Sequence, residues 1–116
     1  MTANEYQKAC LRTMSRTANA SRDNAVLQGV MGLCGEAGEA IDIVKKYLFQ
    51  GHPLGLEEEE HLMKECGDAL WYIATMTDAL GYTLEDVMKA NIEKLKSRYP
   101  NGFDAEHSIA RKDGDI

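Results

Sequence analysis

The sequence predicts an all-α fold, a four-helix-type bundle completed by oligomerisation. Three observations favour it: apolar residues recur at helical spacing in successive segments, short turns join these segments, and no segment alternates apolar and polar residues as a half-buried strand would. A chain of 116 residues forms about one domain. We expect a single domain over residues 1–116, with a helical core at about 3–99 and a C-terminal arm at 100–116.

The first two helices are predicted at residues 3–18 and 23–48. In both segments the apolar residues lie three or four positions apart. In the second segment they fall within roughly 100° of arc at 3.6 residues per turn. They are Val26, Val30, Leu33, Ala37, Ala40, Ile41, Val44 and Leu48. We expect this apolar arc to pack against the next helix.

The third and fourth helices are predicted at residues 57–80 and 83–99. A turn at 49–56, which contains two glycines and a proline, separates the third helix from the second. The third helix opens with four glutamates, whose charge suits the positive end of the helix dipole. The tail at 100–116 has no sustained period, so we predict loop or a partly ordered arm.

The net charge of -6 disfavours nucleic acid polymers and anionic membranes as partners and suits divalent cations. Three cysteines without zinc-finger spacing indicate a reducing environment. The N-terminal residues lack the apolar core of a secretory signal, and no run approaches the roughly 18 apolar residues of a membrane span. We therefore expect a cytoplasmic protein without a membrane partner.

Two pairs of carboxylates, Glu36 with Glu39 and Glu65 with Asp68, border the apolar faces of the second and third helices. Each pair is spaced i, i+3, so its members are neighbours on one face of a helix. If the helices pack antiparallel through their apolar arcs, the four carboxylates meet at one half-buried margin, where cations would relieve their repulsion. Hard oxygen ligands of this kind favour Mg²⁺, with Mn²⁺ as a substitute.

The second helix also carries a row of glycines at every third position: Gly29, Gly32, Gly35 and Gly38. Each glycine costs a helix interior roughly 0.5–1 kcal/mol relative to alanine, so the row needs a compensating role. Gly29 and Gly32 lie near the acidic edge of the helical wheel, where we expect them to leave space for a ligand. Gly35 and Gly38 turn toward the other side, where close helix contact would use them.

The order of the acids resembles a known family. Glu36-x-x-Glu39 is followed, after 25 residues, by Glu65-x-x-Asp68. This arrangement resembles the signature of the MazG-like, all-α nucleoside triphosphate pyrophosphohydrolases, which is E-x-x-E, a spacer and E-x-x-D. The stretches GEAGEAIDIVKK, KECGDALWYIATMTDALGYTLEDVMKANIEKLKSRYP and NGF also look like family sequence. The resemblance therefore covers about residues 23–103.

The resemblance implies Mg²⁺-dependent cleavage of a nucleoside triphosphate between its α and β phosphates. The products would be a nucleoside monophosphate and pyrophosphate, and the role would be nucleotide-pool cleaning. The metal ligands of the family map onto all four acids: Glu36, Glu39, Glu65 and Asp68. Either Glu36 or Glu39 is expected to orient or deprotonate the attacking water, so these two are the predicted catalytic residues.

Four further residues are predicted to contact the substrate. Tyr72 lies four residues after Asp68 on the same helix edge, where its hydroxyl is expected to reach phosphate or sugar. Asn91 and Lys94 resemble the N-x-x-K pair of the family, and Arg98 is a candidate for a phosphate contact. The preferred base and sugar stay open.

Trp71 points away from the apolar arc of the third helix, which is an awkward place for the only tryptophan of a monomer. We expect a subunit interface to cover it, in agreement with the homodimers and homotetramers that the resemblance implies. The three histidines, His52, His61 and His107, are expected at the surface or in loops and not as ligands.

Two other functions stay open at this point. A phosphoribosyl-ATP pyrophosphohydrolase resembles the same superfamily and performs the same α–β cleavage. A non-catalytic oligomeric helical bundle, in contrast, would leave its acids solvated or use them to hold a structural cation. Neutralising Glu39 and Asp68 would separate this bundle from an enzyme, because only an enzyme would lose turnover while keeping its fold.

Overall fold

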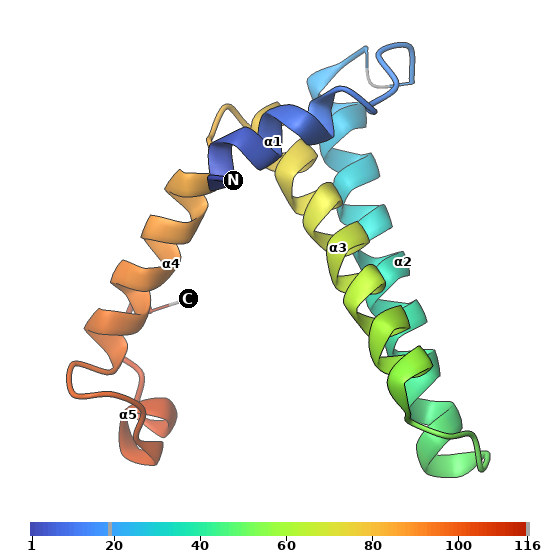
Figure 1. Ribbon diagram of the computed structural model, residues 1–116. Coiled ribbons are helices and arrows are strands. Elements are labelled where there is room, and N and C mark those ends of the chain that lie inside the picture. Colours follow the sequence, from blue (N-terminus) through green and yellow to red (C-terminus); the bar gives the residue numbers. More distant parts are fainter. Residues whose placement is uncertain (19, 116) are drawn as a thin grey trace. The chain divides into compact units, whose positions relative to one another are not determined.

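The computed structural model describes residues 1–18 and 20–115, in which the regular structure is helical and no strand is present. The all-α prediction is confirmed. The chain divides into two compact units, Met1–Leu84 and Glu85–Ile116. The helices are α1 (Ala3–Leu11), α2 (Arg22–Phe49), α3 (Leu56–Ala79), α4 (Leu84–Arg98) and α5 (Ala105–Ile109) (Figure 1). None of the helices in the described ranges is both long and apolar enough to span a membrane.

Three of the four predicted helices, α2, α3 and α4, begin and end within one residue of the expected positions. The first is shorter than predicted, because α1 ends at Leu11 and not at residue 18. Beyond it, Thr13 Oγ1 donates to the carbonyl of Cys10 at 2.9 Å, and the amide of Ala18 donates to Ser15 Oγ at 3.3 Å. Such local side-chain bonds compete with the helical backbone ladder and stabilise turns.

The C-terminal segment is not loop throughout, because it contains α5. Asp104 caps this helix by accepting a hydrogen bond from the amide of His107 at 2.7 Å. A helix of 5 residues is too short to produce a visible apolar period, so the sequence pattern did not reveal it. Within the same unit, Arg98 Nε donates to Asp115 Oδ2 at 2.7 Å, and Arg98 Nη2 pairs with Asp115 Oδ1.

The longest helices, α2 and α3, form an antiparallel pair that dominates the first unit (Figure 1). Gly51 has a φ of +70°, a left-handed conformation that glycine adopts easily and that lets the chain leave α2. At the start of α3, the amide of Gly55 donates to Glu58 Oε2 at 2.9 Å. The predicted turn between antiparallel helices is therefore present, with its helix ends satisfied.

The glycines of α2 have roles opposite to those predicted. A Cβ added to Gly29 would lie 2.5 Å from Met76 Cβ, and one added to Gly32 would lie 2.1 Å from the ring of Tyr72. These two glycines therefore permit the close contact of α2 with α3. Gly35 and Gly38 have no neighbouring atoms within 4 Å of such a Cβ, so they border open space.

The apolar arc that we expected to pack against α3 is only partly covered: Val26, Leu33 and Ala40 are partly buried, whereas Val30, Ala37, Ile41, Val44 and Leu48 are exposed. Together with Leu27 and Cys34, these exposed residues form a stripe on α2 that repeats every seven residues. On α3, Leu56, Met63 and Leu70 form a second exposed stripe with the same repeat. The expected burial is therefore wrong for the exposed part of the arc, and the closest approach of α2 to α3 is at Gly29 and Gly32 instead.

The two exposed stripes lie on one side of the α2–α3 pair. The stripe is rotated from the acid that faces the neighbouring helix by roughly 130° in α2, measured from Glu36, and by roughly 160° in α3, measured from Glu65, in the same sense. Because the helices are antiparallel, rotations of one sense turn both stripes toward the same side of the pair. We call this surface, made of the residues of both stripes, the apolar flank.

The buried core of the first unit lies where α1 packs against α3. Its centre consists of Cys10, Ala74 and Leu84. The buried side chain of Gln7 joins α1 to Ala74 of α3 and to Leu84. Its Nε2 donates to the carbonyl of Ala74 at 3.1 Å, and its Oε1 accepts from the amide of Leu84 at 3.0 Å. A polar group at this depth is stabilising only because its bonds are satisfied.

Trp71 is not left for a subunit interface to cover. It packs against the core where α1 meets α3, and its indole Nε1 donates to Thr13 Oγ1 at 2.9 Å. The helical wheel gave its direction correctly, since Trp71 does point away from α2. The prediction failed because α1, an element that the wheel of α3 does not contain, covers that side.

Candidate metal centre

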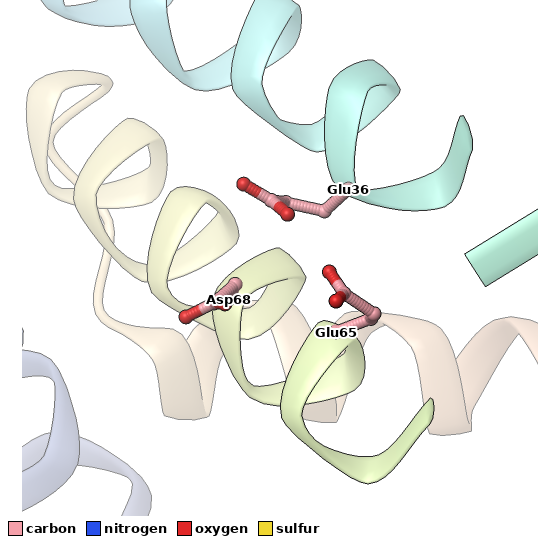
Figure 2. A group of neighbouring side chains, drawn as sticks. All are labelled: Glu36, Glu65 and Asp68. Atoms are coloured by element: carbon pink, nitrogen blue, oxygen red, sulfur yellow. The ribbon is translucent and has the colours of Figure 1, made fainter. Parts of the chain in front are cut away.

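Three of the four predicted acids come together between α2 and α3. Glu36, Glu65 and Asp68 each offer one carboxylate oxygen, and these oxygens all lie within 4.8 Å of one another. Figure 2 shows the Glu36 side chain reaching from α2 toward α3, which carries the other two. We call these three residues the acidic cluster. Carboxylates separated by 28 residues along the chain are thus close enough to share one cation.

Burial differs strongly among the three acids. Glu65 is only 5% exposed, Glu36 is half-buried and Asp68 is exposed. The Oε2 atom of Glu65 is buried and has no donor in the structure. A buried carboxylate oxygen without a partner is destabilising, so this atom points to a ligand that the protein itself does not supply.

The electrostatics of the acidic cluster agree with that interpretation. Partial burial raises the pKa of Glu36, and so do a hydrogen bond that its protonated form would donate to Glu65 and the nearby charges of Glu39, Asp68 and Glu65. Like-charged groups at this separation favour uptake of a proton or of a cation. Oxygen-only ligands from one buried and two more accessible carboxylates fit a hard divalent cation, with room for water.

Glu39, the fourth predicted acid, lies outside the three-residue cluster, although its charge acts on Glu36. It borders an open hollow of about 520 Å³ between the two helices and their connecting turn. The walls of this hollow include Gly35, Gly38 and Glu39 of α2, Pro53 of the turn, and Glu58 and His61 of α3. The open glycines therefore give this hollow its space beside the acids.

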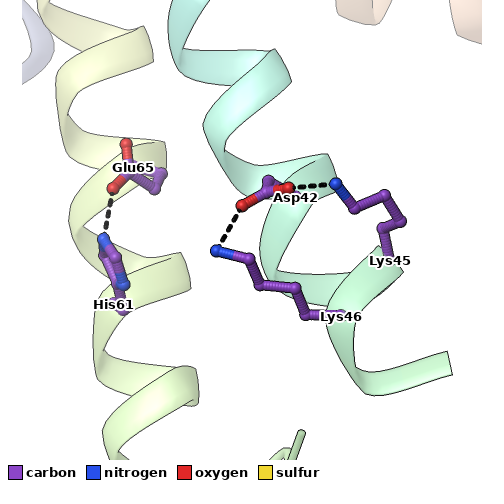
Figure 3. A network of polar contacts seen from close by, with 5 residues as sticks. All are labelled: Asp42, Lys45, Lys46, His61 and Glu65. Atoms are coloured by element: carbon purple, nitrogen blue, oxygen red, sulfur yellow. Dashed lines mark ion pairs between the residues drawn. The ribbon is translucent and has the colours of Figure 1, made fainter. Parts of the chain in front are cut away.

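Asp42 and Lys46 lie on the side of α2 that borders the hollow, but their charges neutralise each other. Asp42 is 2.5 Å from Lys45 Nζ and 2.7 Å from Lys46 Nζ (Figure 3). These hydrogen bonds lower the pKa of Asp42 to about 2. Asp42 therefore keeps its charge at any ordinary pH and serves as a partner for lysines.

Tyr72 lies at a different hollow from Glu39. Its ring packs over Gly32 and lines a space of about 510 Å³ together with Asn24 and Gln28 of α2. Trp71 contacts the same ring edge-on, with centroids 5.0 Å apart. Tyr72 is thus held by packing, and its predicted contact with substrate stays a prediction.

The remaining predicted substrate residues, Asn91, Lys94 and Arg98, belong to α4. Asn91 and Lys94 are exposed. Arg98 is paired with Asp115, and this hydrogen-bonded partner raises the pKa of the arginine. A phosphate would have to displace Asp115 before it could bind Arg98 in the same manner.

His61 is the one residue at this site that the sequence interpretation overlooked. Its Nε2 lies 2.8 Å from Glu65 Oε1 (Figure 3). We expected an exposed surface histidine, and the side chain is indeed 59% exposed, yet it contacts the most buried acid of the cluster. The available signal was its position four residues before Glu65, which places both on one face of a helix.

Comparisons with known proteins agree with this geometry. The family model described as the MazG nucleotide pyrophosphohydrolase domain matches residues 26–103. The chain is 40% identical over 73 residues to the Gene 37 protein of Mycobacterium phage L5, covering 62% of this chain and 64% of that protein. It is 37% identical over 70 residues to the uncharacterized protein YvdC of Bacillus subtilis (strain 168), covering 55% and 66%.

Those matched regions span slightly less than two thirds of either relative. No solved structure matches the chain. The family match covers more than half of the chain and includes the acidic cluster, Glu39 and the whole of α4. The chain belongs to the MazG nucleotide pyrophosphohydrolase family.

Proposed function

We propose that this protein is a Mg²⁺-dependent hydrolase that cleaves nucleoside or deoxynucleoside triphosphates to the monophosphate and pyrophosphate. The observation that carries the proposal is the buried Oε2 of Glu65, which has no donor and lies among acids from two helices. Family membership supplies the class of reaction. Nucleotide-pool cleaning is the role that this reaction suits.

The proposed metal ligands are Glu36, Glu65 and Asp68, with Glu39 as the fourth from the edge of the hollow. When bound, Mg²⁺ draws negative charge from phosphate oxygens and makes a nearby water more acidic. Mn²⁺ has similar ligand preferences and is expected to substitute. Glu65 is the fixed member of the set because it is buried, whereas the other acids are free to adjust.

The chemistry requires water to attack the α-phosphorus. A new bond forms from the water oxygen to this phosphorus, the bond to the bridging oxygen breaks, and pyrophosphate leaves. Glu36 or Glu39 would accept the proton of the water. Glu36 has a raised pKa that suits proton acceptance, while Glu39 faces the hollow where a substrate has room.

We further propose that Tyr72, Asn91, Lys94 and Arg98 contact the nucleotide. The hydroxyl of Tyr72 would reach phosphate or sugar, and the two cationic side chains would pair with phosphate oxygens. Arg98 would exchange Asp115 for a phosphate, since both present two oxygens to the guanidinium.

The apolar flank supports a homodimer or homotetramer. Ile41 is 67% exposed and Leu48 60% exposed, although both belong to a continuous seven-residue repeat. Such a repeat buries its residues by packing against another helix pair. Since Gly35 and Asp42 lie on the opposite side of α2, a second copy on the apolar flank would leave the hollow open.

The assembly is testable by light scattering after size exclusion. Ile41→Asp combined with Leu48→Asp should convert the oligomer to a smaller species, because it buries charge in the interface. Lys64→Asp, a charge change on the exposed opposite side of α3, is the matched control and should leave the mass unchanged. A wild-type chain that is monomeric would contradict this part of the proposal.

The three cysteines, Cys10, Cys34 and Cys66, are free thiols. Structural disulfides are typical of oxidising compartments, and free thiols agree with a reducing one. We therefore propose the cytoplasm as the place of action, where the substrates are also present.

The activity is tested by incubating the full chain and Mg²⁺ with common and modified nucleoside triphosphates and with phosphoribosyl-ATP. The products should be a monophosphate and pyrophosphate, and reaction in ¹⁸O-labelled water should place the label in the monophosphate. Release of a diphosphate and phosphate would contradict the proposed bond cleavage. Exclusive turnover of phosphoribosyl-ATP would favour the alternative substrate.

Variants separate an enzyme from a non-catalytic bundle. Glu65→Gln, Glu39→Gln and Asp68→Asn should each lower kcat/KM by about 10²–10³ with the helical content retained, because each weakens the hold on the cation that would neutralise charge on the reacting phosphate. Glu60→Gln, in the exposed first turns of α3, is the matched control. If every substrate is inert with the folded wild-type chain, the non-catalytic bundle is the better description.

A further inference from the structure

The contact between His61 and Glu65 is the strongest feature of this site that the proposed reaction does not use. His61 lies one helical turn before Glu65 on α3, with its Nε2 2.8 Å from Glu65 Oε1 (Figure 3). At this distance a ring N–H donates to a carboxylate oxygen. The donor is exposed, whereas the side chain of its acceptor is only 6% exposed.

This contact distinguishes the two oxygens of Glu65. Oε1 lies 2.8 Å from the imidazole Nε2 of His61, and Oε2 is buried without a donor. A carboxylate that is held at one oxygen loses freedom to rotate, so its other oxygen keeps one direction. Residues that hold a ligand in this way stabilise metal binding without touching the metal.

A second histidine–carboxylate pair, His107 with Asp104, serves as a comparison for the contact between His61 and Glu65. His107 Nδ1 lies 2.6 Å from Asp104 Oδ2, and both side chains are about half exposed. The other oxygen of Asp104 accepts from the amide of His107, so this carboxylate is satisfied within its own helix end. Glu65 differs because its second oxygen has no local donor.

We propose that His61 is a positioning residue that holds Glu65 in the orientation that binds the divalent cation. The inference rests on the proposed function, since it assumes that the acidic cluster binds metal. It assigns to His61 no contact with the metal or the substrate. The His61 side chain is 59% exposed, so its loss should change helix stability only slightly, and the consequence should be seen in metal affinity.

The test is a titration of the full chain with Mn²⁺, followed by electron paramagnetic resonance of the free ion. His61→Ala should weaken Mn²⁺ binding by about 10–100-fold. His61→Gln should recover most of the affinity, because its side-chain amide also donates an N–H near the same position. His107→Ala, which removes the comparable pair with Asp104, should bind as the wild type does.

The outcomes distinguish this inference from the proposed function. Equal affinities of wild type and His61→Ala would overturn the role of His61 alone. A wild-type chain that is folded and binds no Mn²⁺ would overturn the metal centre itself and this role with it. Failure of His61→Gln to recover affinity would overturn positioning through the N–H. Circular dichroism without cation shows whether each variant keeps its helices.

Discussion

Two pairs of glycines in α2 share one spacing and one helix but have opposite surroundings. Gly29 and Gly32 face Met76 and Tyr72 so closely that even a methyl group would overlap with them, whereas Gly35 and Gly38 face open space. A step of three residues turns a helix by roughly 300°, so a row at this spacing moves around the helix by about 60° per member. The row therefore begins against α3 and ends at the hollow.

The position of a residue in a helical pattern shows which way it faces, but it does not show which element packs against it. The same absence of a side chain permits helix contact in one half of α2 and makes room in the other. The acidic cluster lies at the transition between these halves, since Glu36 is adjacent to Gly35 and faces α3. Close packing on one side thus brings the acids together, and the absence of side chains on the other leaves the hollow open beside them.

Among the glycine substitutions, Gly29→Ala is expected to change the free energy of unfolding most. Its new methyl would lie 2.5 Å from Met76 Cβ and 3.3 Å from Met76 Cα, atoms that cannot move without the helix. We expect a loss of about 1–3 kcal/mol in the free energy of unfolding, despite the better helix propensity of alanine. Urea denaturation followed by circular dichroism measures it, and an unchanged midpoint would refute the close contact.

A smaller loss, about 1 kcal/mol, is expected for Gly32→Ala. The obstacle here is the ring of Tyr72, which is able to swing away where the backbone of α3 is not. In a Tyr72→Leu background the same substitution should become neutral or stabilising, because the ring is absent. A double-mutant cycle with a coupling energy near zero would show that the ring is not what Gly32 accommodates.

In the open pair, Gly35→Ala and Gly38→Ala should each stabilise the chain by about 0.5–1 kcal/mol, since alanine favours the helix and nothing obstructs its methyl group. Gly38→Leu extends this test to the hollow. It should leave stability nearly unchanged but lower kcat/KM by about tenfold or more if substrate occupies that space. Unchanged kinetics would place the substrate elsewhere.

The smallest expected effect is a change in the pH dependence of stability without divalent cation. The pKa of Glu36 is raised above its ordinary value of 4.5 in the folded chain, so the folded chain holds this proton to higher pH than the unfolded chain does. Stability should therefore fall as pH rises from about 4.5 through the raised value. Denaturation in EDTA at several pH values should show this slope.

Glu36→Gln is the variant that checks the sign. It removes the titrating group, so the slope above pH 4.5 should flatten and stability at neutral pH without cation should rise. Saturating Mg²⁺ at 100 times its Kd should stabilise the wild type by about 2.7 kcal/mol and the variant much less. A steeper slope in Glu36→Gln would contradict the repulsion among the acids.

The long helices and the identity of the acids could be predicted from the sequence alone. Periodicity and turn residues located α2, α3 and α4 to within one residue, because long amphipathic segments give a strong signal. The spacing of the four acids predicted that they would meet, and three of them, Glu36, Glu65 and Asp68, do. The family was also evident from these acids, since their order is more specific than either pair alone.

Only the tertiary structure decided which face of each helix meets which neighbour. The helical wheel placed Trp71 and the glycines at correct angles, but α1 and α3 determined what lay at those angles. The apolar arc of α2 was therefore expected to be buried, but five of its eight residues are exposed and belong to the apolar flank. Helices pack where their backbones can approach closely, because close packing gains the most contacts. Along α2 that face is the one where Gly29 and Gly32 have no side chains.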